Sequence, residues 1–174
     1  MTAVKSKRES ILEQLRLSVL TDIDPETDES YNLNINFISR DFREPHELQG
    51  HEFPCVFIVD DFMTSYESLT ADIITTGNDR LNIGQGMNIG IIGYVKETFR
   101  NRPDKAGSLS TLMNQMFSDI LIAMYKDFTM GGNALSVDLL SSRNAIQHSQ
   151  DDDIGVVILI FSIKYDFSPI NKIT

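Results

Sequence analysis

The most regular pattern of apolar and polar positions lies in residues 108–132. Ser108 or Ser110 is suited to cap a helix there, because a serine oxygen accepts a backbone N–H that has no partner within the helix. Gly131 and Gly132 are suited to end it, since glycine tolerates the positive φ at which helices terminate. The apolar face is wide, which predicts a helix that packs on a sheet. Apolar residues recur at steps of three and four, as on one helical face: Leu109, Leu112, Met113, Met116, Ile120, Ala123 and Met124.

A second amphipathic segment, residues 6–20, predicts another helix. Its apolar positions share one helical face: Ile11, Leu12, Leu15 and Val19. The next stretch, residues 21–30, is acidic and contains Pro25, which is typical of a solvated loop. Residues 31–37 then alternate between apolar side chains and asparagine, which predicts a strand with one face in water.

The remaining strands are predicted from short apolar runs. Residues 55–59 form a buried strand that follows Phe53-Pro54, since proline is tolerated where a strand begins. Further strands are expected at 70–76, 87–95, 134–140 and 154–167, and polar loops at 41–52, 96–107 and 141–153. Gly90 and Gly93 mark a bulge or a close backbone approach within their strand. The segment 62–86 is the least regular part.

This order of elements predicts the fold class. Strands that are mostly antiparallel, combined with two helices, are typical of an α+β domain. We expect a single domain over residues 1–174, a mostly antiparallel β-sheet with two α-helices packed on one face. No repeat or linker divides the sequence.

The charge and the cysteine content argue against several classes of protein function. The 174 residues carry 15 basic and 25 acidic side chains, a net charge of −10, which argues against a DNA-binding face. The single cysteine, Cys55, excludes an internal disulfide and lies in an apolar run where thiols are inert. No apolar run approaches the roughly 20 residues of a membrane span, and no signal-peptide core is present, so an intracellular domain is expected.

No motif for catalysis or cofactor binding is complete. His46 and His51 resemble a zinc-protease pair, but their spacing of five, with Gly50 between, does not match the required i, i+4 positions. Gly84 and Gly86 precede a strand, whereas a dinucleotide fingerprint follows one, so a turn is expected. Asp60-Asp61 and the run 151–153 are typical of solvated carboxylates, and His148 stands alone. We therefore expect no enzyme, no metal and no cofactor.

An ordered set of sequence features resembles the tail terminator proteins of tailed bacteriophages, across residues 6–167. The features are the N-terminal amphipathic helix, Phe53-Pro54 before an apolar strand, and a strand that ends in Gly93-Tyr94-Val95. They continue with a helix that closes on Asp127, Thr129 and Gly131-Gly132, and a last strand with Phe161 and Tyr165. The segment 62–86 and the run 151–153 are less typical of that family.

The resemblance implies a small subunit that forms a homohexameric ring in the virion. Such a ring caps the head-proximal end of the tail tube, stops tube polymerisation and offers a docking surface to the neck. Its implied partners are further copies of itself, the tail tube protein, a head-completion or neck protein, and the tail sheath where the tail is contractile. DNA passes through the channel without specific binding, and no membrane is involved. The acidic charge is compatible with such a channel, because like charges repel.

Contacts are expected in the loops 40–52, 78–86 and 143–153, since loops at the ends of a rigid sheet commonly carry recognition. Arginine is favoured there for its planar donor fork, although each arginine is also an ordinary solvated residue. The alternatives are another neck or head–tail joining protein, a small metal-dependent hydrolase that uses His46 and His51, and an adaptor for a host protein. The candidate interface residues are Arg40, Arg43, His46, Asn78, Arg80, Arg100, Arg102, Arg143, Asp151, Asp152 and Asp153.

Overall fold

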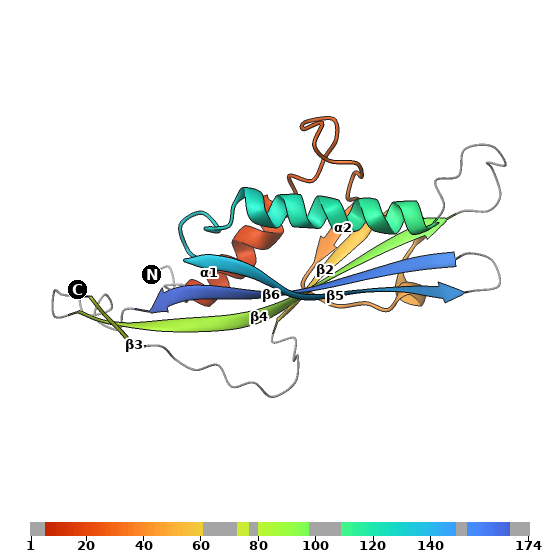
Figure 1. Cartoon of the computed structure of the whole chain (residues 1–174). Helices are drawn as coiled ribbons and strands as arrows, with labels where there is room; N and C mark the ends of the chain where they lie inside the picture. The colour runs from red at the N-terminus through yellow and green to blue at the C-terminus, as the bar shows by residue number, and fades with distance from the viewer. Residues whose placement is uncertain (1–5, 61–72, 77–79, 98–108, 149–152, 168–174) are drawn as a thin grey trace, which may run out of the picture.

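The computed structural model describes residues 6–60, 73–76, 80–97, 109–148 and 153–167, with only the backbone described for 73–76, 80–85 and 167. Helix α1 (Lys7–Gln14) continues into a π-helical segment (Leu15–Val19), and α2 spans Leu109–Lys126. Figure 1 shows α2 lying along the sheet. The strands are β1 (Phe37–Ser39), β2 (Cys55–Asp60), β3 (Ile73–Thr76), β4 (Arg80–Glu97), β5 (Ser136–His148) and β6 (Asp153–Phe167).

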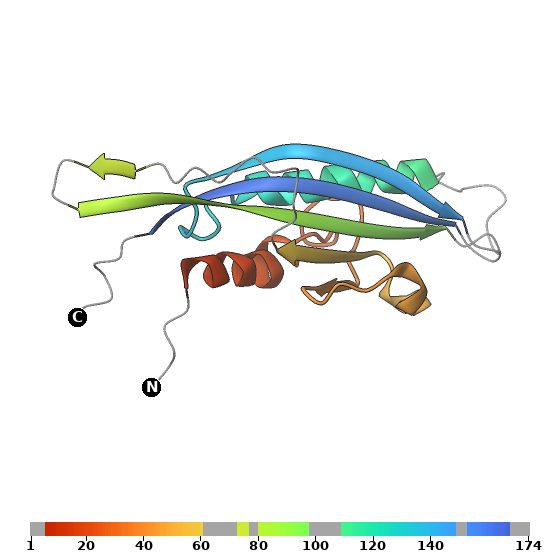
Figure 2. The same cartoon turned by 90° about the horizontal axis from the view of Figure 1, so that it is seen from below.

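The strands form one six-stranded sheet in the order β1-β2-β4-β6-β5, and β3 pairs with the first part of β4. The β1–β2 pair is parallel, whereas the other pairs are antiparallel. The long strands β4 and β6 pair from Ile83 opposite Phe167 to Glu97 opposite Asp153, and both run the length of the sheet (Figure 2). The predicted α+β class, with a mostly antiparallel sheet and two helices, is confirmed.

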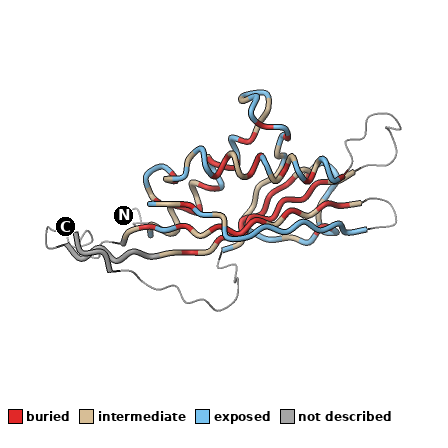
Figure 3. Tube along the Cα trace, in the orientation of Figure 1, coloured by how far each residue is buried: buried red, intermediate tan, exposed pale blue. Residues whose placement is uncertain are grey.

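Both helices cover the same face of the sheet. Their apolar faces meet the sheet in one buried cluster, and Figure 3 shows buried residues in red on the helices and on the strands that face them. Met113, Met116 and Met124 are buried there, as expected of core methionines. The members that carry the contact are Ile11, Leu12 and Leu15 from α1, Met116 and Ile120 from α2, and Ile89, Ile91, Val157, Leu159 and Phe161 from the sheet.

Two glycines let α2 approach the sheet closely. A Cβ added at Gly93 would lie 2.8 Å from Met116 Cγ, and one added at Gly155 would lie 2.6 Å from Met113 Cγ. The close approach predicted from the sequence is therefore confirmed at Gly93. A side chain at either position would have to displace a methionine of α2, because core packing leaves little free space.

The ends of α2 follow from local chemistry. At its start, the backbone N–H of Leu109 donates to Glu97 Oε2 at 3.1 Å, so a carboxylate from β4 satisfies this terminus. Ser110 lies inside the helix, and Ser108 lies outside the described residues. After Lys126, the chain turns through Met130, Gly131 and Gly132 with φ of 49°, 64° and 82°. The helix therefore ends at Lys126, several residues before Gly131, so the prediction that the glycine pair ends it is wrong in position, although both glycines adopt the expected positive φ in the turn that follows.

The predicted strand at residues 31–37 is wrong over most of its length, because only Phe37 belongs to β1. The segment keeps its alternation, with Tyr31 and Leu33 buried, but its first half bonds to α2 and only Asn36, at its end, bonds toward β2 through Pro54. The carboxylate of Asp119, which is fully buried, accepts the backbone N–H of Asn32 at 3.0 Å and that of Leu33 at 2.8 Å. It also accepts the side-chain amide of Asn32 at 2.7 Å. The buried carboxylate thus takes the place of a strand partner.

Two predicted loops are largely strands. In the expected loop 78–86, β4 already begins at Arg80, so Gly84 and Gly86 lie in a strand and not in a turn. In the expected loop 141–153, β5 continues to His148 and β6 begins at Asp153. The extension of β5 was concealed because residues 141–148 are exposed, and a strand that is covered on neither face lacks the alternation of a half-buried one.

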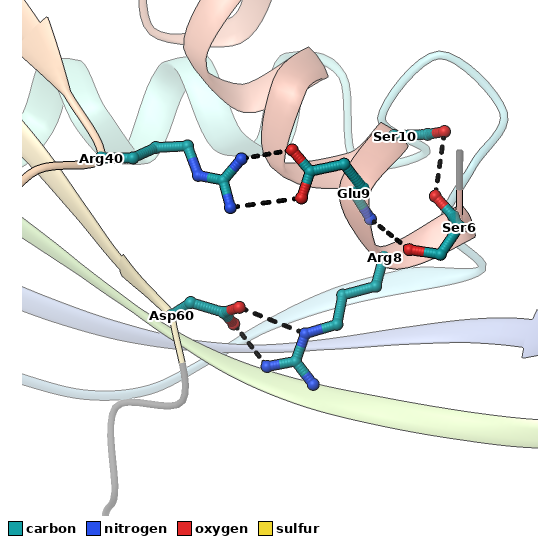
Figure 4. A network of polar contacts seen from close by, with 6 residues as sticks. All are labelled: Ser6, Arg8, Glu9, Ser10, Arg40 and Asp60. Carbon is teal, nitrogen blue, oxygen red and sulfur yellow. Dashed lines mark hydrogen bonds and ion pairs between the residues drawn. The ribbon is translucent and has the colours of Figure 1, made fainter. Parts of the chain in front are cut away.

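Three consecutive residues tie the start of α1 to three other elements. Lys7 pairs with Asp166 of β6, Arg8 with Asp60 of β2, and Glu9 with Arg40 just after β1. Figure 4 shows Arg8 and Arg40 each facing its carboxylate, with Ser6 capping the helix by accepting the backbone N–H of Glu9. Successive helix residues point about 100° apart, so one turn reaches several directions. Asp60, expected to be solvated, is therefore an ion-pair partner.

A fourth ion pair connects the acidic loop to α2, and it predicts an acid-sensitive stability. The Lys126 ammonium, followed by the Ser30 backbone N–H, holds the pKa of Asp28 well below its usual range. Such a group stabilises the fold above its unfolded pKa, and this contribution is lost as pH falls through the folded pKa. We therefore expect Asp28→Asn to be less stable than the wild type at neutral pH, with the difference shrinking below about pH 4.

Urea unfolding at a series of pH values measures this difference. Glu29→Gln, which changes an exposed carboxylate of the same loop, is the matched control and should follow the wild-type profile. A difference between Asp28→Asn and the wild type that stays constant down to pH 2 would contradict the role of this ion pair.

Candidate functional site

The loop 40–52 carries three of the predicted contact residues and covers the sheet face opposite the helices. It contains two 3-10 turns, Pro45–Glu47 and Gly50–Glu52. The Phe42 ring packs edge-on against Phe57 of β2, with ring centroids 5.8 Å apart. The second core lies beneath this loop and consists of Phe53, Cys55, Phe57, Ile92, Tyr94 and Ile154.

Arg40 and Arg43 lie in this loop and are both engaged within the chain. Arg40 pairs with Glu9, as described above. The Arg43 guanidinium lies 2.6 Å from Glu52 Oε1 and 4.5 Å from the centroid of the Phe37 ring. The backbone N–H of Gln49, and then Arg43, lower the pKa of Glu52. The side chains of Arg40 and Arg43 thus hold the loop to the rest of the chain. A contact of either arginine with another subunit would have to compete with its ion pair.

His46 and His51 do not share a helical face. His46 lies in the first 3-10 turn and His51 in the second, and both side chains are exposed. Within residues 6–60, 73–76, 80–97, 109–148 and 153–167, no group of three or more histidine, cysteine or acidic residues could hold a metal ion. Cys55 is fully buried, and burial raises its pKa to about 12, so its thiol stays protonated at neutral pH.

The other predicted contact residues are spread over the molecule. Arg80 is the first residue of β4, and only its backbone is described. Arg143 is exposed on β5, and Asp153 begins β6. His148 Nδ1 lies 2.9 Å from Asp153 Oδ1, so His148 is paired across the β5–β6 end and does not stand alone. Five predicted residues lie outside the described part: Asn78, Arg100, Arg102, Asp151 and Asp152.

The free edge of β5 is the most extensive candidate for assembly. Within the described structure, β5 pairs only with β6, and every residue from 140 to 148 is exposed. Leu140 and Ile146 are 49% and 47% exposed, so this edge offers apolar side chains as well as backbone groups. An edge strand of this kind is a template for pairing with another chain unless something blocks it.

Two features limit the free edge at one end. The register shifts between Leu139 and Ser141, which places a β-bulge at Leu140. The backbone N–H of Leu139 donates to the Tyr125 hydroxyl of α2 at 3.2 Å, so α2 covers the strand at this point. The free edge of β5 therefore consists of residues 140–148.

No family model matches the chain, and no curated protein matches it at a significant level. Among the helices of the described residues, none has the length and apolar content to cross a membrane. The geometry of the edge and of the loops therefore carries the functional argument.

Sequence reasoning missed the free edge because it assigned residues 141–153 to a loop. The stretch from Ser141 to His148 contains serine, asparagine and glutamine, with Ala145 and Ile146 as its apolar residues. A strand that is exposed on both faces has no alternation of apolar residues. The signals for a strand here were the length of the stretch and its lack of proline and glycine.

Proposed function

We propose that this protein is a structural virion subunit, a tail terminator that forms a ring on the head-proximal end of a phage tail tube. Its work is assembly and not chemistry. The ring stops addition of tube subunits and offers its other side to the neck of the capsid. Copies of the chain, the tube protein and a neck protein are the partners, and the ring is a hexamer in this proposal.

The observation that carries the proposal is the free edge at residues 140–148. The bulge at Leu140 and the charge of Arg143 protect part of this edge, but it contains no proline or lysine and residues 144–148 remain exposed, which is unusual for a chain that stays alone. Pairing or packing of this edge with a neighbouring subunit would satisfy its backbone groups and bury Leu140 and Ile146. A subunit that associates laterally through such an edge is suited to a closed ring.

Two further features support the proposal. The segments that resemble the terminator family fall on structural boundaries: Pro54 precedes β2, Val95 lies near the end of β4, and Gly131-Gly132 follow α2. The net charge of −10 is also compatible with a channel that passes DNA without binding it.

The test is to produce the chain together with the tail tube protein of the same phage and to image the tubes by electron microscopy. A ring on one end, and tubes that stop elongating when the protein is added, are the expected results. A ring bound to the portal instead would support the head–tail joining alternative. Unlimited elongation with no bound protein would contradict the proposal.

A charge on the free edge is expected to block the ring without unfolding the subunit. Ile146→Lys places an ammonium on an edge that must approach another subunit, and the wild-type side chain is already half exposed. We expect capped tube ends to fall at least about tenfold at the same protein concentration. Counts of capped ends in micrographs measure this effect.

The matched control is Ser118→Lys, which adds the same charge to an exposed position in the middle of α2. Both variants should keep the wild-type circular dichroism spectrum. If Ile146→Lys caps tubes as well as Ser118→Lys, the edge of β5 takes no part in the ring.

A further inference from the structure

In its strand order, the described sheet ends with β5 on one side and with β1 on the other (Figure 2). Strands β1, β2 and β6 run in one direction, and β4 and β5 run in the opposite one. If a second copy continues the sheet in the same orientation, its β1 therefore lies antiparallel to β5 of the first copy. Such a contact joins different surfaces of two copies, which makes it a heterologous interface.

Each of these two edges carries an isoleucine on the face that the helices cover. Ile38 of β1 packs against the cluster beneath the helices and is only partly buried. Ile146 of β5 pairs with Gly155, where an added Cβ would meet Met113 of α2, so Ile146 lies on the same face. It is 47% exposed. A contact between the two isoleucines of neighbouring copies would remove more apolar surface of both from water.

Each edge also carries a charged group without a partner in the described structure, and the two charges are opposite. Arg143 of β5 is exposed and pairs with Ile158, which packs on the second core, so it lies on the face away from the helices. Asp41 is exposed and follows β1 by two residues, in the loop that covers this same face. Residues 140–148 contain no acidic side chain, so the β5 edge of a second copy offers Arg143 no carboxylate. Opposite charges at an interface favour one orientation of docking.

One antiparallel register brings both pairs of residues together. It places Ile38 of one copy opposite Ile146 of the other. Asp41 lies three residues after Ile38, and Arg143 lies three residues before Ile146, so the same register sets Asp41 opposite Arg143. A shift by one residue would turn each side chain toward the wrong face of the sheet. A shift by two residues in either direction would set Ile38 against a polar side chain of β5.

We propose that β5 of one copy pairs with β1 of the next copy in this register, so that the sheet continues from subunit to subunit. The contact rests on the proposed function, since it specifies how neighbours in the ring engage. Ile146 then packs beside Ile38 on the helix side, and Arg143 pairs with the carboxylate of Asp41 on the other side. Each copy offers one edge of each kind, and contacts of this type close into a ring or extend as a filament.

Cysteine cross-linking tests this register directly. One chain carries Ser39→Cys and the other carries Ala145→Cys, two small residues that lie opposite each other in the proposed pair. Opposite residues of antiparallel strands have Cα atoms about 4.5–5.5 Å apart, which is within the range that a disulfide needs. The native Cys55 is fully buried and does not compete. After oxidation by copper phenanthroline, we expect a disulfide-linked pair from the mixed chains and a ladder of linked copies from the double variant.

Two further cysteine pairs serve as controls. Ser39→Cys with Ser118→Cys measures chance collisions, since Ser118 is exposed in the middle of α2. Ser39→Cys with Ser141→Cys tests the register, because Ser141 lies about 13 Å from Ala145 along β5. Cross-linking of the Ser141 pair as strong as that of the Ala145 pair would overturn the register. A disulfide-linked dimer of Ala145→Cys alone would show that two β5 edges pair with each other, and it would also overturn the contact.

The cross-linking is carried out on rings assembled at tube ends and on concentrated protein in solution. Rings that form without cross-linking above the Ser118→Cys control would overturn the contact while the terminator proposal stands. Absence of rings on tube ends would overturn the terminator proposal, and the cross-linking in solution would then decide the contact.

Reversal of the two charges provides a second measurement without oxidation. Arg143→Glu and Asp41→Lys each bring like charges together, and each is expected to weaken self-association at least about fivefold in sedimentation equilibrium. The double variant restores an opposite pair and should return to within about twofold of the wild type. Arg16→Glu, which changes an exposed arginine of the π-helical segment, should leave self-association unchanged. A double variant that associates as weakly as the single variants would overturn the contact between Arg143 and Asp41.

Discussion

Replacing Asp119 by alanine is expected to lower the free energy of unfolding by about 3 kcal/mol, because it removes the acceptor of two backbone N–H groups and one side-chain amide. The N–H of Leu33 would remain buried without a partner, and a buried unsatisfied donor costs about 1–3 kcal/mol by itself. The segment 31–36 would lose its attachment to α2, although Tyr31 and Leu33 would still favour burial. Urea unfolding followed by circular dichroism measures the change.

Two variants make this prediction specific. Ser118→Ala alters the preceding, exposed residue of α2 and should leave the stability within about 0.5 kcal/mol of the wild type. Asn32→Ala removes only the side-chain donor and is expected to cost about 1 kcal/mol. If Asp119→Ala is no more destabilising than Asn32→Ala, the carboxylate is not the anchor that the geometry indicates.

Gly155→Val is expected to destabilise the protein by about 2–3 kcal/mol through overpacking between β6 and α2. Its Cβ alone would lie 2.6 Å from Met113 Cγ and 2.9 Å from Val95 Cγ2, closer than non-bonded carbon atoms approach. Either α2 moves away from the sheet, or Met113 leaves its rotamer. Thermal and urea unfolding of the purified variant measure the loss.

A double-mutant cycle identifies the cause of that loss. Met113→Ala alone leaves a cavity and is destabilising, but combined with Gly155→Val it provides the space that the new side chain needs. The double variant should therefore be more stable than the sum of the two single changes. Gly50→Ala is the matched glycine control, since nothing lies within 4 Å of its added Cβ, and it should be close to neutral. Strict additivity of the two core changes would exclude a direct clash.

The helices and the buried strands could be predicted from the sequence, because an element with one buried face carries apolar residues at a regular spacing. The three- and four-residue steps of α2, the run that becomes β2, and the final strand β6 each have a covered face. The close approach at Gly93 could also be expected, since glycine in a strand commonly marks such a site. These are positions at which local pattern and tertiary packing agree.

The sequence-based predictions fail in two kinds of place: where a strand is covered on neither face, and where a segment is held by a residue that is distant in sequence. Residues 141–148 are exposed on both sides, so β5 has no alternation there. The segment 31–36 has strand alternation, but the backbone N–H groups of Asn32 and Leu33 donate to Asp119, which lies more than 80 residues further along the sequence. A hydrogen bond between residues that are far apart in the sequence leaves no pattern in the residues around either partner. The ion pair of Arg40 was missed for the same reason, since Glu9 is distant from it in sequence. Arg43 pairs with Glu52 of its own loop, and this pair was missed because charged pairs follow no period.

The pairing of Lys7 with Asp166 joins residues that are 159 positions apart. As the chain leaves the ribosome, α1 is made before its partners, and Arg8 and Glu9 find theirs within residues 40–60. Lys7 has to wait for β6, the last strand of the described structure. Folds that depend on such distant contacts form slowly, because a large loop has to close before the contact can contribute. We therefore expect Lys7 and its neighbours to be among the last parts to become ordered during synthesis, and a nascent chain stalled before β6 to leave α1 accessible to proteases.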